Sequence, residues 1–176
     1  MNHSTLRYSD ERDKIYGLAG MAITLVALDG EKYLCEISLD APAGESIVMS
    51  HDYGFKGNPR MSARIVWEQT LADLRMTTSM TLGNIICRRY VLGHRGVGDD
   101  DIQPVRDAVR AEGLDHCGLD NDESDRLFDG CLSYVQRVFR HPGVQEVAHN
   151  FAGHIGRRRN LSGAEAIEIL SSLGLS

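Results

Sequence analysis

The pattern of apolar and polar positions predicts a chain made mostly of helices. An apolar run covers residues 15–28 and is bounded by Lys14 and Asp29. Ser9 or Asp10 stands where an N-cap would begin a helix. Within the run, apolar side chains recur at helical spacing, at Ile15, Leu18, Ala22, Leu25 and Val26. The sequence therefore predicts a central helix ending at about Leu28, and the glycines at 17 and 20 suggest a close neighbour.

Between residues 32 and 49 the apolar period changes to two. Alternate apolar positions occur at Tyr33, Cys35, Ile37 and Leu39. A turn with proline and glycine at 40–44 separates them from a second apolar stretch at 47–49. This pattern predicts a β-hairpin over about 32–49. An isolated two-stranded hairpin is only marginally stable in water, so we expect it to pack on helices or to pair its edge with a second copy.

Helical stripes dominate the rest of the chain. Asn58 and Pro59 predict the start of a helix that runs to about Arg75, with a further apolar segment at 82–92 that either continues it or forms another helix. Further helices are predicted over about 99–111, 122–140 (capped by Asp122 and Asp125), 142–155 and 162–173 (with a Ser162–Glu165 capping box). The predicted fold class is mainly α, with six or seven helices around a central N-terminal hydrophobic helix and one β-hairpin. A single domain over 1–176 is expected, with 1–9 as a polar lead.

Charge and cysteine content limit the classes of function. The 176-residue chain has a formal net charge of -6, which argues against non-specific binding to nucleic acid or to an anionic membrane. Of the 19 basic residues only Lys14, Lys32 and Lys56 are lysines, so the surface favours bidentate arginine contacts. Four widely separated cysteines without a C-x-x-C motif are expected to be reduced. The apolar run at 15–28 is shorter than the about 20 residues that a membrane span needs. We therefore expect a cytoplasmic protein with no membrane contact.

One helix carries a candidate metal or small-ligand site. Glu146 and His149 have the E-x-x-H spacing that carboxylate-bridged di-iron bundles use, but the second pair that such sites require is missing. At about 100° per residue these two side chains should face away from the buried stripe. His154 falls almost in line with that stripe, which predicts a core or interface histidine. The candidate metal set is thus Glu146, His149 and His154, with the cofactor itself unknown.

A basic run offers an alternative function. Arg157, Arg158 and Arg159 follow the helix that starts at Pro142, as in a helix-turn-helix with a basic end. Basic residues at a helix C-terminus are also favoured by the helix dipole alone, and no aromatic residues are interleaved with them. Together with the acidic net charge, this makes nucleic-acid binding the less favoured interpretation.

Three further motifs lack an element that their chemistry needs. The glycine-rich stretch at 93–98 is followed by three aspartates, which contradict phosphate binding and predict a connector. The aspartates at 120–125 lack the glycine and the glutamate of a calcium loop, so helix capping explains them better. His116 and Cys117 are adjacent in a predicted loop, where neighbouring side chains seldom face each other.

Every candidate catalytic set therefore lacks its second required element. The leading hypothesis is a non-enzymatic intracellular interaction or accessory protein that self-associates as a homodimer, with an unknown protein partner. One alternative is an enzyme or sensor that holds a metal or small ligand with histidines and carboxylates. The other is a nucleic-acid binder that uses the basic run. For the leading hypothesis, we expect Ile47→Pro to dissociate the dimer by breaking the hairpin edge.

Overall fold

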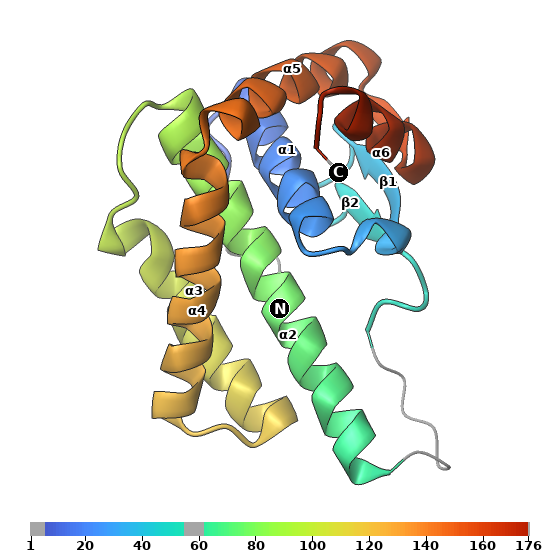
Figure 1. The fold of residues 1–176 in the computed structure, drawn as a ribbon. Helices are drawn as coiled ribbons and strands as arrows, with labels where there is room; N and C mark the ends of the chain where they lie inside the picture. The colour runs from blue at the N-terminus through green and yellow to red at the C-terminus, as the bar shows by residue number, and fades with distance from the viewer. Residues whose placement is uncertain (1–5, 55–61, 176) are drawn as a thin grey trace.

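The computed structural model describes residues 6–54 and 62–175, and it is mainly helical with a small antiparallel sheet (Figure 1). This confirms the predicted fold class. In chain order, the α-helices and strands are α1 (Glu11–Ala27), β1 (Leu34–Ser38), β2 (Ile47–Met49), α2 (Ala63–Ile86), α3 (Asp99–Glu112), α4 (Asn121–Arg140), α5 (Pro142–Arg158), β3 (Asn160–Ser162) and α6 (Gly163–Ser172). Two π-helical segments, η3 (Cys87–Leu92) and η4 (Gly113–Cys117), extend α2 and α3.

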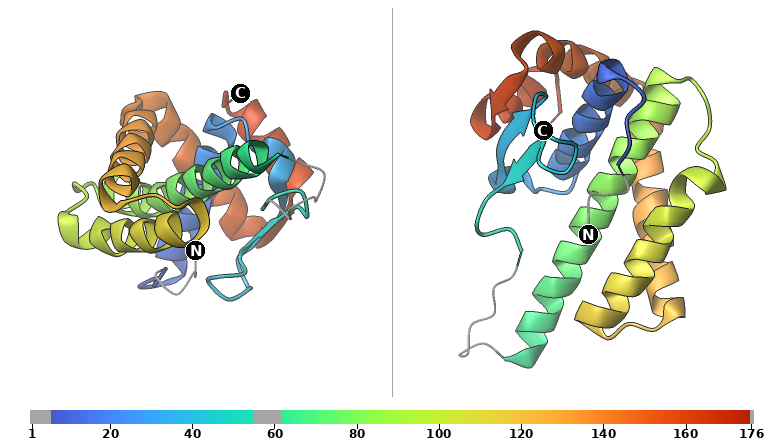
Figure 2. Two further views of the ribbon diagram at one scale, coloured as in Figure 1. Left: turned by 90° about the horizontal axis from the view of Figure 1, so that it is seen from below. Right: turned by 180° about the vertical axis from the view of Figure 1, so that it is seen from behind.

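Helix α1 is the centre of the molecule, as its apolar run predicted. Asp10 caps it by accepting a hydrogen bond from the backbone N–H of Asp13. Helix α2 packs along one side of α1, α5 crosses its end, and the sheet with α6 lies on the other side (Figures 1 and 2). A Cβ atom on Gly20 would lie 2.2 Å from the carbonyl oxygen of Gly83. Only glycine at this crossing lets α1 and α2 approach so closely.

Helix α2 runs without a break to Ile86, so the apolar segment predicted at 82–92 continues this helix. Its threonines do not interrupt it, because the Thr81 hydroxyl donates to the Thr77 carbonyl oxygen within the helix. The predicted start at Asn58 and Pro59 lies outside the described residues. The first half of α2 extends beyond α1. Helices α3 and α4 pack against the side of α2 that faces away from α1 (Figures 1 and 2).

The predicted hairpin is present but belongs to a three-stranded sheet with the order β2-β1-β3. Ile37 of β1 lies opposite Ile47 of β2 on one side and Leu161 of β3 on the other. Both Ile37 and Leu161 are fully buried, and α6 packs against β1. The third strand and α6 stabilise the hairpin within the molecule, so its stability does not require a second copy.

The cap of α4 differs from the prediction. Asp120 is the N-cap and forms a capping box with Glu123. Asp125 does not cap the helix; its carboxylate accepts hydrogen bonds from Arg110 at 2.7 Å and from Arg106 at 3.3 Å. The predicted capping box at the start of α6 is confirmed. None of the helices in the described ranges has the length and apolarity needed to cross a membrane.

Candidate anion-binding pocket

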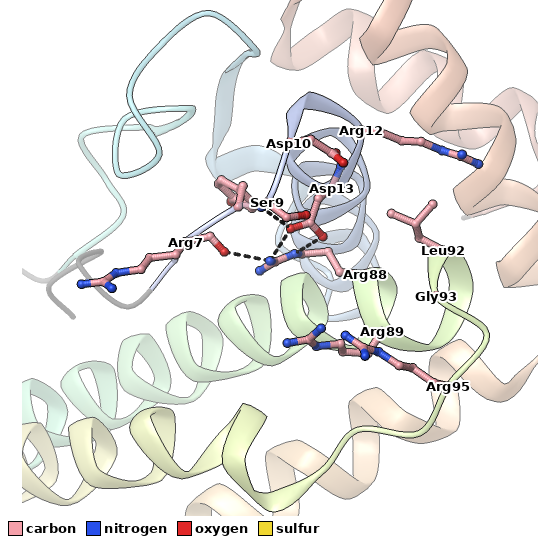
Figure 3. A pocket seen from close by; sticks show the side chains of 11 residues that line it. Arg7, Ser9, Asp10, Arg12, Asp13, Arg88, Arg89, Leu92, Gly93 and Arg95 are labelled. Carbon is pink, nitrogen blue, oxygen red and sulfur yellow. Dashed lines mark hydrogen bonds and ion pairs between the residues drawn. The ribbon is translucent and has the colours of Figure 1, made fainter.

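A cavity of about 630 Å³ opens between the start of α1 and the end of α2 (Figure 3). Its volume falls in the range of about 300–1,000 Å³ that small-molecule sites occupy. Five arginines and two aspartates are among the residues that line it; we call this cavity the arginine pocket. Its lining residues are Arg7, Tyr8, Ser9, Asp10, Arg12, Asp13, Arg88, Arg89, Leu92, Gly93 and Arg95.

One wall of the arginine pocket is the π-helical segment η3 and the loop after it. Such π turns are frequent at functional sites. The chain then turns through His94, whose φ of 49° is uncommon for a residue other than glycine. After this turn the backbone N–H of Arg95 donates to the carbonyl oxygen of Arg89 at 3.0 Å. The fold thus brings Arg95 back onto the wall that already carries Arg88 and Arg89 (Figure 3).

A buried ion pair forms the floor. Two guanidinium nitrogens of Arg88 contact the Asp13 carboxylate, Nε–Oδ1 at 2.7 Å and Nη2–Oδ2 at 2.5 Å. The two side chains are only 12% and 13% exposed. Arg88 also donates to the Arg7 carbonyl oxygen at 2.8 Å and to Asn84 Oδ1 at 3.3 Å. Asn84 is fully buried and donates to the Tyr8 hydroxyl at 2.8 Å. These bonds fix the residues before α1 against the end of α2.

The charge states of the floor follow from these contacts. Burial raises the pKa of the Asp13 carboxyl, but hydrogen bonds from Arg88 and from the Ser9 backbone N–H outweigh burial and hold that pKa below its usual value. Burial raises the pKa of Tyr8 above that of a free tyrosine. At neutral pH the Asp13 carboxylate is therefore ionised and the Tyr8 hydroxyl is neutral. The charge of Arg88 is balanced by Asp13, so the role of Arg88 is to hold the pocket together through its hydrogen bonds.

Of the four other arginines that line the pocket, one is ion-paired and three keep their charge available. Arg89 pairs with Asp101 of α3 at 2.6 Å and is partly exposed. In the described ranges, no carboxylate pairs with the guanidinium groups of Arg7, Arg12 or Arg95. Arg12 comes from the first turn of α1, and Arg95 from the opposite wall (Figure 3). The pocket therefore carries excess positive charge on a chain whose formal net charge is -6. A negatively charged ligand is the chemical species that this arrangement attracts.

The predicted metal residues lie elsewhere, on α5. Glu146 and His149 are exposed, and His154 is half-buried. The imidazole Nδ1 of His149 forms a hydrogen bond with the Tyr16 hydroxyl at 2.7 Å, which connects α5 to α1. Over residues 6–54 and 62–175, no group of three His, Cys, Asp or Glu side chains has an arrangement that could hold a metal ion. Metal binding by this set stays a prediction.

The basic run at the end of α5 is largely occupied by ion pairs. Arg158 contacts Glu165 at 3.1 Å. Arg159 donates to Asp40 at 2.9 Å through Nε and contacts Glu11 at 3.1 Å through Nη2. Arg157 is exposed. Two of the three arginines thus connect the end of α5 to neighbouring elements.

Sequence reasoning missed the arginine pocket because its residues come from separate predicted elements. Arg7 belonged to a polar lead, Arg88 and Arg89 to a helical segment, and Arg95 to a connector. The sequence did carry one signal. Arginines flank the predicted start of the first helix, at 7 and 12, and the predicted end of the apolar segment at 82–92, at 88, 89 and 95. Comparison with protein families, with curated proteins and with solved structures finds no match to this chain.

Proposed function

We propose that the protein is a non-enzymatic binding protein that holds a small anionic molecule in the arginine pocket. The observation that carries the proposal is the presence of Arg12 and Arg95 on opposite walls, without carboxylate partners in the described ranges. A guanidinium group is planar and donates paired hydrogen bonds to phosphate or carboxylate oxygens. The ligand class is therefore a small molecule with a phosphate group or with several carboxylates.

The lining supports binding more than catalysis. Arginine side chains do not lose their protons at physiological pH, so they bind a negatively charged ligand without transferring protons to or from it. The Asp13 carboxylate is kept ionised and is hydrogen-bonded by Arg88, so it is not free to act as a base. The Tyr8 hydroxyl accepts a hydrogen bond from Asn84, and its raised pKa keeps it neutral. These groups place and stabilise an anion, and they supply no activated nucleophile.

Isothermal titration calorimetry with inorganic pyrophosphate tests this proposal. We expect saturable binding that weakens with added salt, because salt screens exposed charges. Arg95→Gln removes one charged donor, and a hydrogen bond to a charged group is worth about 1.5–3 kcal/mol, so the affinity should fall by about 10- to 150-fold. Arg157→Gln is the matched control, because it removes an exposed arginine that does not line the pocket.

Two results would contradict anion binding at this pocket. One is the absence of any heat of binding for pyrophosphate at low salt. The other is an equal loss of affinity in Arg95→Gln and Arg157→Gln, which would indicate a diffuse charge effect. Glycerol, which carries no charge, serves as the ligand control and should give no binding heat.

We also propose that the protein works as a homodimer in the cytoplasm. All four cysteines are free, and Cys87, Cys117 and Cys131 are buried, which supports a reducing compartment. Within the described residues, surfaces that suit self-association are the edge of β2, where Val48 is 44% exposed, and an apolar groove along α2. If the β2 edge were the interface, Ile47→Pro would dissociate the dimer, which light scattering would detect as a halved mass.

A further inference from the structure

An apolar groove runs along one face of α2, on the side of Leu28. It consists of two adjoining hollows of about 350 and 270 Å³, which share Leu28, Arg75 and Ser79. We call it the α2 groove. Apolar side chains from the end of α1, from α2 and from α4 supply most of its lining, at Leu28, Leu71, Ala72, Met76, Leu127 and Tyr134. Gly130 of α4 also lines the groove, and the space beside it is open, since a Cβ atom there would contact nothing within 4 Å.

The same face of α2 also carries a protruding apolar side chain. Ile65 lies in the first turn of α2 and is 43% exposed. Residues seven apart on an α-helix lie within about 20° of each other, so Ile65, Ala72 and Ser79 share one face. The molecule therefore presents an apolar projection at one end of this face and a hollow at the other end.

Charges along this face have an order that suits an antiparallel copy of the helix. Glu68 lies four residues before Ala72, and Arg75 lies three residues after it. Glu68 pairs with Arg64 at 2.8 Å, but that pair is exposed and such pairs contribute little. No carboxylate in the described part of the chain forms an ion pair with Arg75.

Resting on the proposed self-association, we propose that the α2 groove binds a second copy of this chain, with the two α2 helices antiparallel and a two-fold axis beside Ala72. The small Ala72 side chain permits a close crossing. Ile65 of each copy then enters the hollow around Ser79 of the other copy, and Glu68 of each copy faces Arg75 of the other. A two-fold interface requires a surface that is complementary to itself. This face meets that requirement, because its apolar side chain fits its own hollow and its acidic residue faces its own basic residue when two copies run antiparallel.

The first test compares two single substitutions by multi-angle light scattering over a dilution series. Ile65→Glu places a charge in the proposed interface, so we expect the dissociation constant of the dimer to rise more than about tenfold, as for a central apolar contact. Val48→Glu is the matched control, because Val48 is 44% exposed and lies on the β2 edge. It should leave the dimer intact. Circular dichroism checks that each variant is folded.

The second test exchanges the charges. Glu68→Arg and Arg75→Glu should each weaken the dimer, because like charges then face each other across the axis. The double variant should restore most of the affinity, since opposite charges meet again. A dimer that survives Ile65→Glu and is lost in Val48→Glu would overturn the α2 interface while leaving self-association in place. A wild-type chain that stays monomeric throughout would overturn both.

Discussion

Two arginine clusters of this molecule have opposite environments. The arginine pocket gathers Arg12, Arg88, Arg89 and Arg95 from distant parts of the chain and leaves part of their charge unpaired. The basic run at 157–159 is continuous in sequence, yet two of its three arginines pair with carboxylates. The placement of carboxylates therefore decides which cluster can attract a ligand, and the local density of arginine does not.

The first turn of α1 supplies a carboxylate partner to each of the two arginine clusters, from different faces of the helix. Asp13 points to the pocket and binds Arg88, whereas Glu11 contacts Arg159 together with Asp40. The pair in the pocket is largely buried, and the pairs of Arg159 are substantially exposed. Buried and exposed ion pairs respond differently to the loss of one partner, so substitutions can separate their roles.

The largest effect on stability is expected for Asp13→Asn. This change leaves the buried Arg88 guanidinium without its counter-charge, and breaking a buried pair costs about 3–5 kcal/mol. Urea denaturation should show this loss in the free energy of unfolding. Asp40→Asn, which affects an exposed pair, is the control and should lose far less. Equal stability of wild type and Asp13→Asn would mean that the pair is not part of the folded state.

Acid should remove the same contribution from the wild type. Because the pKa of Asp13 is lower in the folded state, its carboxylate stabilises the fold above the unfolded-state pKa of about 3.9. That contribution is lost as pH falls through the folded-state pKa. The stability difference between wild type and Asp13→Asn should therefore be constant from pH 6 to about 5 and narrow below about 4. A difference that stays constant at low pH would contradict the assignment.

Arg159→Gln should have a smaller effect. Its two ion pairs are exposed, and exposed pairs contribute about 0–1 kcal/mol each, so we expect a loss of about 1 kcal/mol in urea denaturation. Pyrophosphate affinity should be unchanged, because this arginine lies outside the pocket. A fall in affinity as large as that of Arg95→Gln would remove the distinction between the clusters.

Arg157→Gln should have the smallest effect. The side chain is exposed, and surface substitutions of this kind usually change stability by less than about 0.5 kcal/mol. Fluorescence polarisation with a labelled DNA duplex would test the alternative role of the run. Binding that disappears in Arg157→Gln would revive the nucleic-acid hypothesis.

Helices were predictable from the sequence where local signals agree. A cap at Ser9 or Asp10 and the apolar period predicted α1, and the Ser162 capping box predicted α6. The strand at 160–162 was missed, because three residues are too few to show a period of two and their pairing with β1 is non-local. The cap of α4 was misplaced by two residues, because several acidic residues there could serve equally well in sequence.

The candidate site was harder to predict than the fold, for a physical reason. Arg88 and Asp13 are 75 residues apart in sequence, and only the close crossing of α1 and α2 brings them together. Arg95 reaches the same wall through a turn at His94 that no sequence period specifies. A binding pocket built from such tertiary contacts leaves no local motif.

Two-dimensional ¹H–¹⁵N NMR of the protein titrated with pyrophosphate tests the central claim most directly. The spectrum reports on both arginine clusters at the same time. We predict saturable chemical-shift changes confined to residues 7–13 and 88–95, around the pocket of Figure 3. Changes centred on residues 157–159, or no changes at any residue, would contradict an anion-binding role for the arginine pocket.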